Sequence, residues 1–155
     1  MGGLARLIDN KVQHGAATLD EGADQLLESD GNALLIGILL DQRIKAEMAF
    51  TGPLKMRQRL GHLDMRKISK MDLEKLQDVF REKPAVHSFA NMMAGRVQEL
   101  AQTLVDEYKG DGANLWSDGS DLKTIQKRLG KIKGFGPSKC AMVGDALDLF
   151  GHRSF

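Results

Sequence analysis

The chain has 155 residues, the usual size of one globular domain with a hydrophobic core. Hydrophobic residues make up 42% and charged residues 28%, with only three prolines, which excludes a disordered or collagen-like chain. The formal net charge is +1, so a nucleic-acid-binding surface would need an uneven distribution of charge.

The N-terminal part of the chain predicts an arm followed by helices. We divide the sequence into an N-terminal arm over residues 1–18 and one helical domain over residues 19–155. Leu26 and Leu27 indicate a short amphipathic helix, which breaks at residues 29–32. Residues 33–40 are almost all apolar, so we expect a second helix there in the centre of the core.

Capping and stop signals place the following helices. Apolar spacing predicts a helix that begins at Pro53 and ends at Gly61. Asp72 is a candidate N-cap for a helix over residues 73–81. A long helix is expected over residues 89–109, with its methionines as core filler.

Two further helices complete the pattern. Asp121 is a candidate cap for a helix that runs to Leu129, and Ser138 is expected to begin a helix that runs toward Phe150. No segment alternates apolar and polar residues as a strand would. The sequence therefore predicts an all-α fold, a helical bundle with a helical hairpin near its C-terminus.

Charge is distributed unevenly along the chain. Residues 19–30 hold five acidic residues and no basic one. Residues 121–139 hold six basic residues against Asp121 alone, a net charge of +5. Such a cluster is typical either of a solvated helix surface or of a nucleic-acid-binding surface. Its members are Lys123, Lys127, Arg128, Lys131, Lys133 and Lys139.

The turn Gly134-Phe135-Gly136 lies between the last two predicted helices. Glycine lets the backbone bend sharply and approach a phosphate closely, while N–H groups at the following helix start face the anion. Phe135 is expected to anchor the turn in the core, and the neighbouring lysines add attraction to phosphates that is independent of sequence. The alternative is an ordinary tight turn between packed helices.

A second motif lies upstream, where residues 34–44 read as an apolar helix followed by the polar loop Asp41-Gln42-Arg43. This segment and the hairpin, taken in this order, resemble the helix-hairpin-helix (HhH-GPD) DNA glycosylase superfamily, the endonuclease III and alkyladenine-glycosylase group. The resemblance covers roughly residues 30–151. It implies a protein that binds the minor-groove side of bent duplex DNA and flips a nucleotide into a pocket between two helical lobes.

The resemblance also assigns roles to single residues. Gln42 matches the glutamine that such enzymes insert into the base stack. Arg43 would touch phosphates or fill the vacated space, or else is simply solvated. The residues expected to bind DNA are Gln42, Arg43, Lys131, Lys133, Gly134, Phe135, Gly136, Ser138 and Lys139.

The sequence departs from the family at both catalytic positions. Ser138 stands where bifunctional members carry a nucleophilic lysine. Lys139 follows it, and because one residue turns a helix by about 100°, we expect Lys139 to point to phosphate, with nucleophilic attack as its alternative role. The family's aspartate beyond the second hairpin helix has no match before Phe155, which leaves Asp41 as the local candidate acid. These departures favour a monofunctional N-glycosylase.

Cofactors and membranes are not expected. The single cysteine, Cys140, excludes a disulfide within the chain and a cysteine-ligated zinc or iron–sulfur centre, and the four histidines lack the spacing of a metal site. The resemblance allows a monovalent cation bound at the hairpin. The longest apolar run, residues 33–40, is shorter than the roughly 20 residues that span a bilayer. We therefore expect a cytoplasmic protein, associated with the nucleoid if the cell is prokaryotic.

The hypotheses for function stand in order. The first is a base-excision-repair enzyme that binds double-stranded DNA through backbone phosphates and the minor groove. The second is a noncatalytic DNA-binding relative that recognises bent or damaged duplex. The third is a helical protein-interaction module whose hairpin merely packs helices. The sequence pattern specifies neither the lesion nor an oligomeric state.

Overall fold

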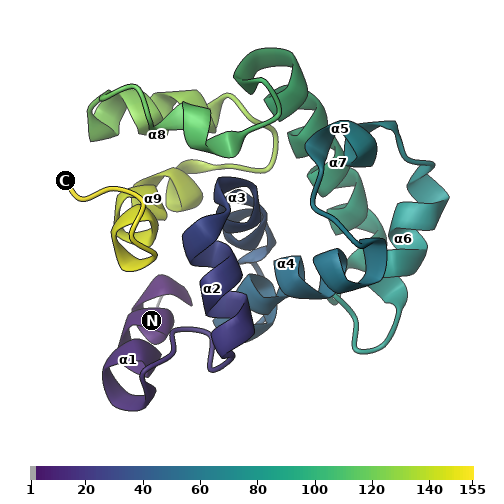
Figure 1. Cartoon of the computed structure of the whole chain (residues 1–155), viewed down its shortest axis with the longest axis horizontal. Coiled ribbons are helices and arrows are strands. Elements are labelled where there is room, and N and C mark those ends of the chain that lie inside the picture. Colours follow the sequence, from purple (N-terminus) through teal and green to yellow (C-terminus); the bar gives the residue numbers. More distant parts are fainter. Residues whose placement is uncertain (1–2) are drawn as a thin grey trace.

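The protein is described by a computed structural model that covers residues 3–155, and over this range it contains helices and no strand (Figure 1). The predicted all-α helical bundle is therefore confirmed. No helix in this part of the chain is long and apolar enough to cross a membrane. The elements are α1 (Gly3–His14), α2 (Glu21–Ser29), α3 (Gly31–Leu40), α4 (Ala46–Leu60), α5 (Met65–Lys70), α6 (Leu73–Arg81), α7 (Ala90–Tyr108), the 3₁₀ helix η1 (Gly112–Leu115), α8 (Leu122–Gly130) and α9 (Pro137–Leu149).

Helix α3 lies in the centre of the fold, as its apolar sequence predicted. Every residue from 33 to 40 is buried. Asp30 ends α2 and begins α3, and its carboxylate accepts hydrogen bonds from the backbone N–H groups of Asn32 and Ala33. A Cβ at Gly37 would lie 2.7 Å from the Phe50 ring, so the absence of a side chain lets α3 and α4 pack closely.

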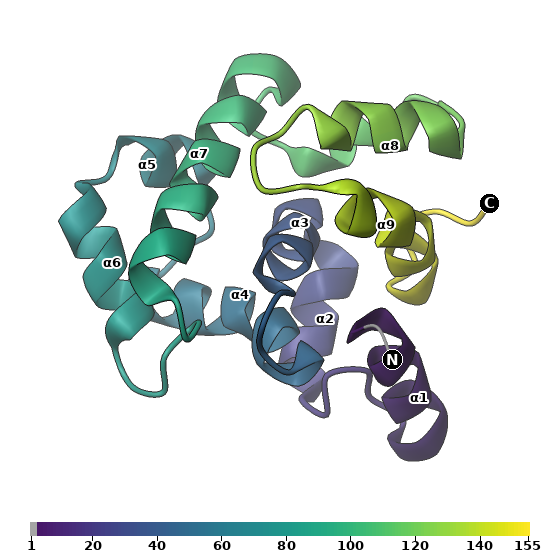
Figure 2. The same ribbon diagram turned by 180° about the vertical axis from the view of Figure 1, so that it is seen from behind.

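The helices form two groups that α4 connects. Helices α5, α6 and α7 pack together on one side, while α1, α2, α3, α8 and α9 lie on the other (Figures 1 and 2). The turn between α8 and α9 lies against α3 and near α7, because a Cβ at Gly134 would be 2.6 Å from Leu39 Cδ1 and 3.7 Å from Arg96 Cδ. This packing brings the C-terminal hairpin to the end of α3.

Most of the segment expected as an N-terminal arm is helical. Residues 3–14 form α1, which buries Leu4 and Leu7 in the common core. Arg6 on α1 forms an ion pair with Glu47 on α4. Residues 1–2 lie outside the described part of the chain. Helix α1 thus contributes to the same core as the rest of the bundle.

Two expectations about the middle of the chain were wrong. Helix α4 begins at Ala46, so Pro53 lies buried in its interior and does not start it, whereas the predicted end at Gly61 is confirmed by its left-handed φ of +82°. Met92 is 49% exposed and fills no core, although Met93 beside it is buried. Capping by the Asp121 side chain is confirmed, but the Asp72 side chain makes no capping hydrogen bond.

Candidate functional site

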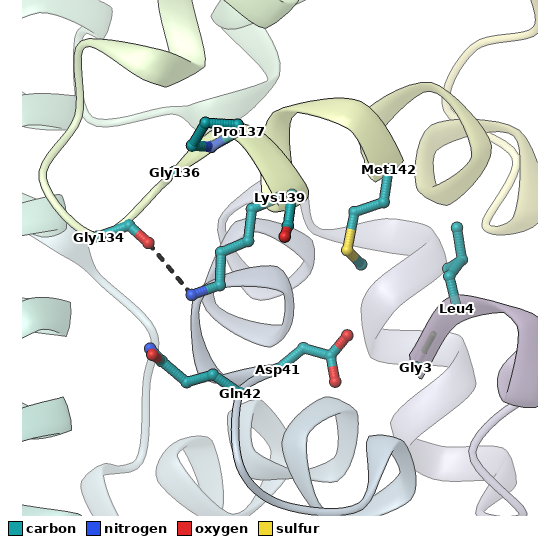
Figure 3. Close-up of a pocket in the computed structure, with 10 residues that line it drawn as sticks. Gly3, Leu4, Asp41, Gln42, Gly134, Gly136, Pro137, Lys139 and Met142 are labelled. Carbon is teal, nitrogen blue, oxygen red and sulfur yellow. Dashed lines mark hydrogen bonds between the residues drawn. The ribbon is translucent and has the colours of Figure 1, made fainter. Parts of the chain in front are cut away.

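Three segments far apart in sequence enclose a cavity of about 530 Å³ beside the turn between α8 and α9 (Figure 3). We call it the hairpin cavity. A second cavity of about 590 Å³, the loop cavity, adjoins it and extends along residues 41–46. Both are lined by Gly3, Asp41 and Gln42. The hairpin cavity is completed by Leu4, Gly134, Gly136, Pro137, Ser138, Lys139 and Met142.

Asp41 lies at the junction of the two cavities, directly after α3. Its φ of −75° and ψ of 69° are those of an inverse γ-turn, closed by a 2.8 Å hydrogen bond from Gln42 N–H to the Leu40 carbonyl. Helix α1 lies against the carboxylate, since a Cβ on Gly3 would be 2.4 Å from Asp41 Oδ2. Partial burial raises the pKa of the Asp41 carboxyl, and the positive charge of Lys139 lowers it by a smaller amount.

Lys139 points into the hairpin cavity, which corrects the expectation that it points outward to phosphate. Helix α9 begins at Pro137, and its first turn presents both Ser138 and Lys139 to the cavity. The Lys139 side chain is 9% exposed, and its Nζ donates a 3.2 Å hydrogen bond to the Gly134 carbonyl (Figure 3). Burial lowers the pKa of the Lys139 amine, and the nearby Asp41 carboxylate opposes this shift.

Gln42 and Arg43 extend from the same loop in different surroundings. The Gln42 amide donates to the Leu39 carbonyl at 3.3 Å and lies 3.6 Å from the sulfur of Met93, so half-burial restrains it beside the cavity. Arg43 is exposed, with a left-handed φ of +59°. Its guanidinium carbon lies 5.9 Å from the ring centroid of Phe89, which is itself 43% exposed.

The two glycines of the turn have different reasons to be glycine. Gly134 has a φ of +100° and contacts Leu39, so both its conformation and the space around it require glycine. Gly136 has an ordinary φ of −77°, is exposed, and would have nothing within 4 Å of an added Cβ. The fold alone does not require glycine at this position.

The backbone of the turn also offers hydrogen-bond donors. Within residues 3–155, the N–H groups of Gly134, Gly136 and Ser138 donate to no acceptor of the chain. Gly136 and Ser138 are exposed at the start of α9, where the helix dipole favours an anion. Lys131 and Lys133 are exposed on the same turn, and Lys133 Nζ lies 3.8 Å from the Glu99 carboxylate. This surface matches the charge and donor pattern of a phosphate-binding turn.

Phe135 has the structural role expected of it. Its side chain is 3% exposed and belongs to the core, so it anchors the turn, and only its backbone is left for a contact with DNA. The carbonyls of Ile132, Gly134 and Phe135 each accept a hydrogen bond from within the chain, so the turn shows no ring of free carbonyls for a monovalent cation. In the described part of the chain, no three His, Cys, Asp or Glu side chains group as a metal site.

The structure adds site residues that the sequence gave no reason to select. Gly3 and Leu4 enter the hairpin cavity from α1, and Met142 enters it from the second turn of α9. His87 is fully buried next to the Asp41 loop and accounts for the only histidine with no exposed surface in residues 3–155. Periodicity could not find these residues, because their partners lie far away along the chain.

Three comparisons, against protein-family models, curated proteins and solved structures, found no match to this chain. What the site does is therefore inferred from its own arrangement. A turn with free N–H donors and exposed lysines lies beside a cavity that holds a carboxylate, an amide and an amine.

Proposed function

We propose that the chain is a base-excision-repair protein that binds double-stranded DNA and removes a damaged base as a monofunctional DNA N-glycosylase. One observation carries the proposal: the phosphate-binding turn and the cavity containing Asp41 share residues of the same short segment, Gly134 to Lys139. A nucleotide whose phosphate lay on this turn would be next to an opening large enough to receive its base.

Binding would rely on backbone phosphates. The free N–H groups at Gly136 and Ser138 would hold a phosphate directly, and Lys131 and Lys133 would add salt-dependent attraction. The exposed Phe89 and Arg43 lie together at the end of the neighbouring loop, as a pair suited to contact bases opened from the minor groove. These contacts fix position on the duplex and carry no base sequence preference.

Base removal would be performed by Asp41 and a water molecule. The water oxygen adds to C1′ of the sugar, the electron pair of the C1′–N bond leaves with the base, and the Asp41 carboxylate accepts the proton of the water. A raised pKa makes Asp41 a better proton acceptor than an exposed aspartate. Lys139 would hold Asp41 ionised at neutral pH through its positive charge.

A noncatalytic DNA-binding protein is the second candidate. It is favoured by the two departures from the family pattern, Ser138 and the unmatched distal aspartate. A helical module that only binds other proteins is the third. We place the protein in the cytoplasm, where a single free thiol such as Cys140 is ordinary.

The test is duplex cleavage after alkali, on oligonucleotides that carry uracil, alkylated adenine, oxidised guanine or a mismatch. We expect breaks only after alkali for at least one lesion, and Asp41→Asn should abolish them while duplex affinity stays within about twofold. Asp145→Asn is the matched control, because Asp145 is an exposed carboxylate of α9 that lines neither cavity of the site.

Binding is recorded in parallel across salt concentrations. Each phosphate contact should contribute about 0.9 to the slope of log affinity against log salt. Salt-dependent binding without abasic sites on any duplex would replace the enzyme by its noncatalytic relative. No binding at low salt would leave the hairpin as a packing element only.

A further inference from the structure

His87 makes an unusual set of hydrogen bonds for a residue with no exposed surface. The backbone N–H of Phe89 donates to its Nδ1 at 2.9 Å. Its Nε2 lies 3.1 Å from the Leu40 carbonyl and 3.0 Å from the Gln42 carbonyl. Because an amide N–H can only donate, Nδ1 is the acceptor and the ring proton is on Nε2, where it is shared by the two carbonyls.

The two carbonyls that His87 binds lie on either side of Asp41. The inverse γ-turn at Asp41 and the left-handed φ of Arg43 are both uncommon conformations for such residues. Within residues 3–155, the imidazole is the sole hydrogen-bond donor to the Gln42 carbonyl. The shape of the loop is therefore held from outside by His87.

The same imidazole joins this loop to the segment before α7. Phe89 N–H is bound by Nδ1, and the Arg43 guanidinium lies over the Phe89 ring. The rings of His87 and Phe89 are 6.0 Å apart. One side chain thus fixes the loop that lines both cavities and the exposed aromatic residue next to it.

We propose that His87 is a positioning residue, whose imidazole holds the Asp41 carboxylate at the junction of the hairpin and loop cavities by binding the carbonyls on both sides of it. Its effect on base removal rests on the proposed function, whereas its effect on the placement of Asp41 does not. His87 touches no substrate in this arrangement and acts only through the loop.

Two substitutions separate the ends of the imidazole. In His87→Gln, the side-chain N–H₂ reaches the position of Nε2 and can donate to both carbonyls. In His87→Asn, the shorter amide oxygen replaces Nδ1 and can accept from Phe89 N–H, while donation to Leu40 and Gln42 is lost. The asparagine variant therefore releases the loop, and the glutamine variant retains it.

The primary readout is the pKa of the Asp41 carboxyl, measured by NMR titration of its side-chain carbon in the full chain. Burial raises this pKa in the native protein, so a loop released by His87→Asn should let it fall toward that of an exposed aspartate. His87→Gln should keep the raised value. For base removal, we expect a loss of about 10²-fold in single-turnover rate for His87→Asn, with recovery to within about fivefold in His87→Gln.

Ile68→Ala controls for lost stability, because Ile68 is fully buried in α5 and lines neither cavity. It should destabilise the fold and leave the Asp41 pKa unchanged. The proposal is overturned if His87→Asn leaves that pKa at the native value, if glutamine does not restore it, or if Ile68→Ala shifts it equally. A native chain that cleaves no lesion would sink the proposed function alone, since the Asp41 titration would still decide the role of His87.

Discussion

Lys139 and Asp41 face one cavity, and each alters the protonation of the other (Figure 3). The Lys139 charge lowers the pKa of Asp41, against the larger effect of burial. Lys139→Met removes the charge and keeps a side chain of similar length. We therefore expect the Asp41 pKa to rise further and the acid limb of the rate profile to move to higher pH, since Asp41 must be ionised to accept a proton.

Single-turnover rates from pH 5 to pH 9 check this prediction, on the best lesion of the alkali assay. An electrostatic role leaves the plateau rate of Lys139→Met at high pH within about tenfold of the native rate. A nucleophilic lysine behaves differently: activity is lost at every pH, and borohydride reduction links the native protein covalently to abasic DNA. That second pattern would contradict the monofunctional mechanism.

At the scale of elements, the turn between α8 and α9 separates the needs of folding from the needs of binding. Gly134→Ala places a Cβ 2.6 Å from Leu39 Cδ1 at a left-handed φ, and should destabilise the fold by about 1–3 kcal/mol. Gly136→Ala meets open space at an ordinary φ, so stability should stay within about 0.5 kcal/mol. Its new methyl group would nevertheless keep a phosphate away from the turn.

Urea denaturation and duplex affinity, measured on both variants at one salt concentration, test this division. For Gly136→Ala we expect native stability together with an affinity loss of about tenfold, the equivalent of about 1.4 kcal/mol. Native affinity in Gly136→Ala would show that the exposed glycine serves no phosphate, and would favour the reading of this turn as simple packing.

The sequence predicted the helices whose signals are local. The apolar run of α3, the Asp121 cap of α8 and the glycine stop of α4 all lie within one or two turns of the element they define. The start of α4 was misplaced because proline favours a first turn, whereas here Pro53 is accommodated inside a long buried helix. Helix α1 was missed because its two buried leucines, four and seven residues from the start, form too short a pattern.

The candidate site was predictable in its parts and not in its assembly. Asp41, Gln42 and the glycine turn were selected from their motifs, and the structure brings all of them to one cavity. The direction of Lys139 could not be derived, because it depends on where α9 starts and on how the hairpin packs against α3. The part played by α1 depends on contacts across most of the chain.

At the scale of the whole molecule, one buried histidine links the site to global stability. Burial lowers the pKa of His87, the Gln42 and Leu40 carbonyls oppose this, and the charge of Lys139 lowers it further. In the unfolded chain the imidazole takes up a proton near pH 6.5, whereas in the folded chain it stays neutral to lower pH. The unfolded state therefore binds more protons below pH 6.5, and stability must fall as the pH falls through this range.

We expect the free energy of unfolding, from urea titrations at pH 7.5, 6.5 and 5.5, to decrease toward acid, with a slope from His87 of at most about 1.4 kcal/mol per pH unit. His87→Gln should flatten this decrease, because glutamine does not titrate. Asp41 acts with the opposite sign: its raised pKa makes the folded state bind more protons than the unfolded state at pH values above 3.8, so it adds stability as the pH falls there. An equally steep decrease in His87→Gln would mean that the acid sensitivity of the fold comes from other groups, and that the imidazole in the core takes up its proton as readily as one in water.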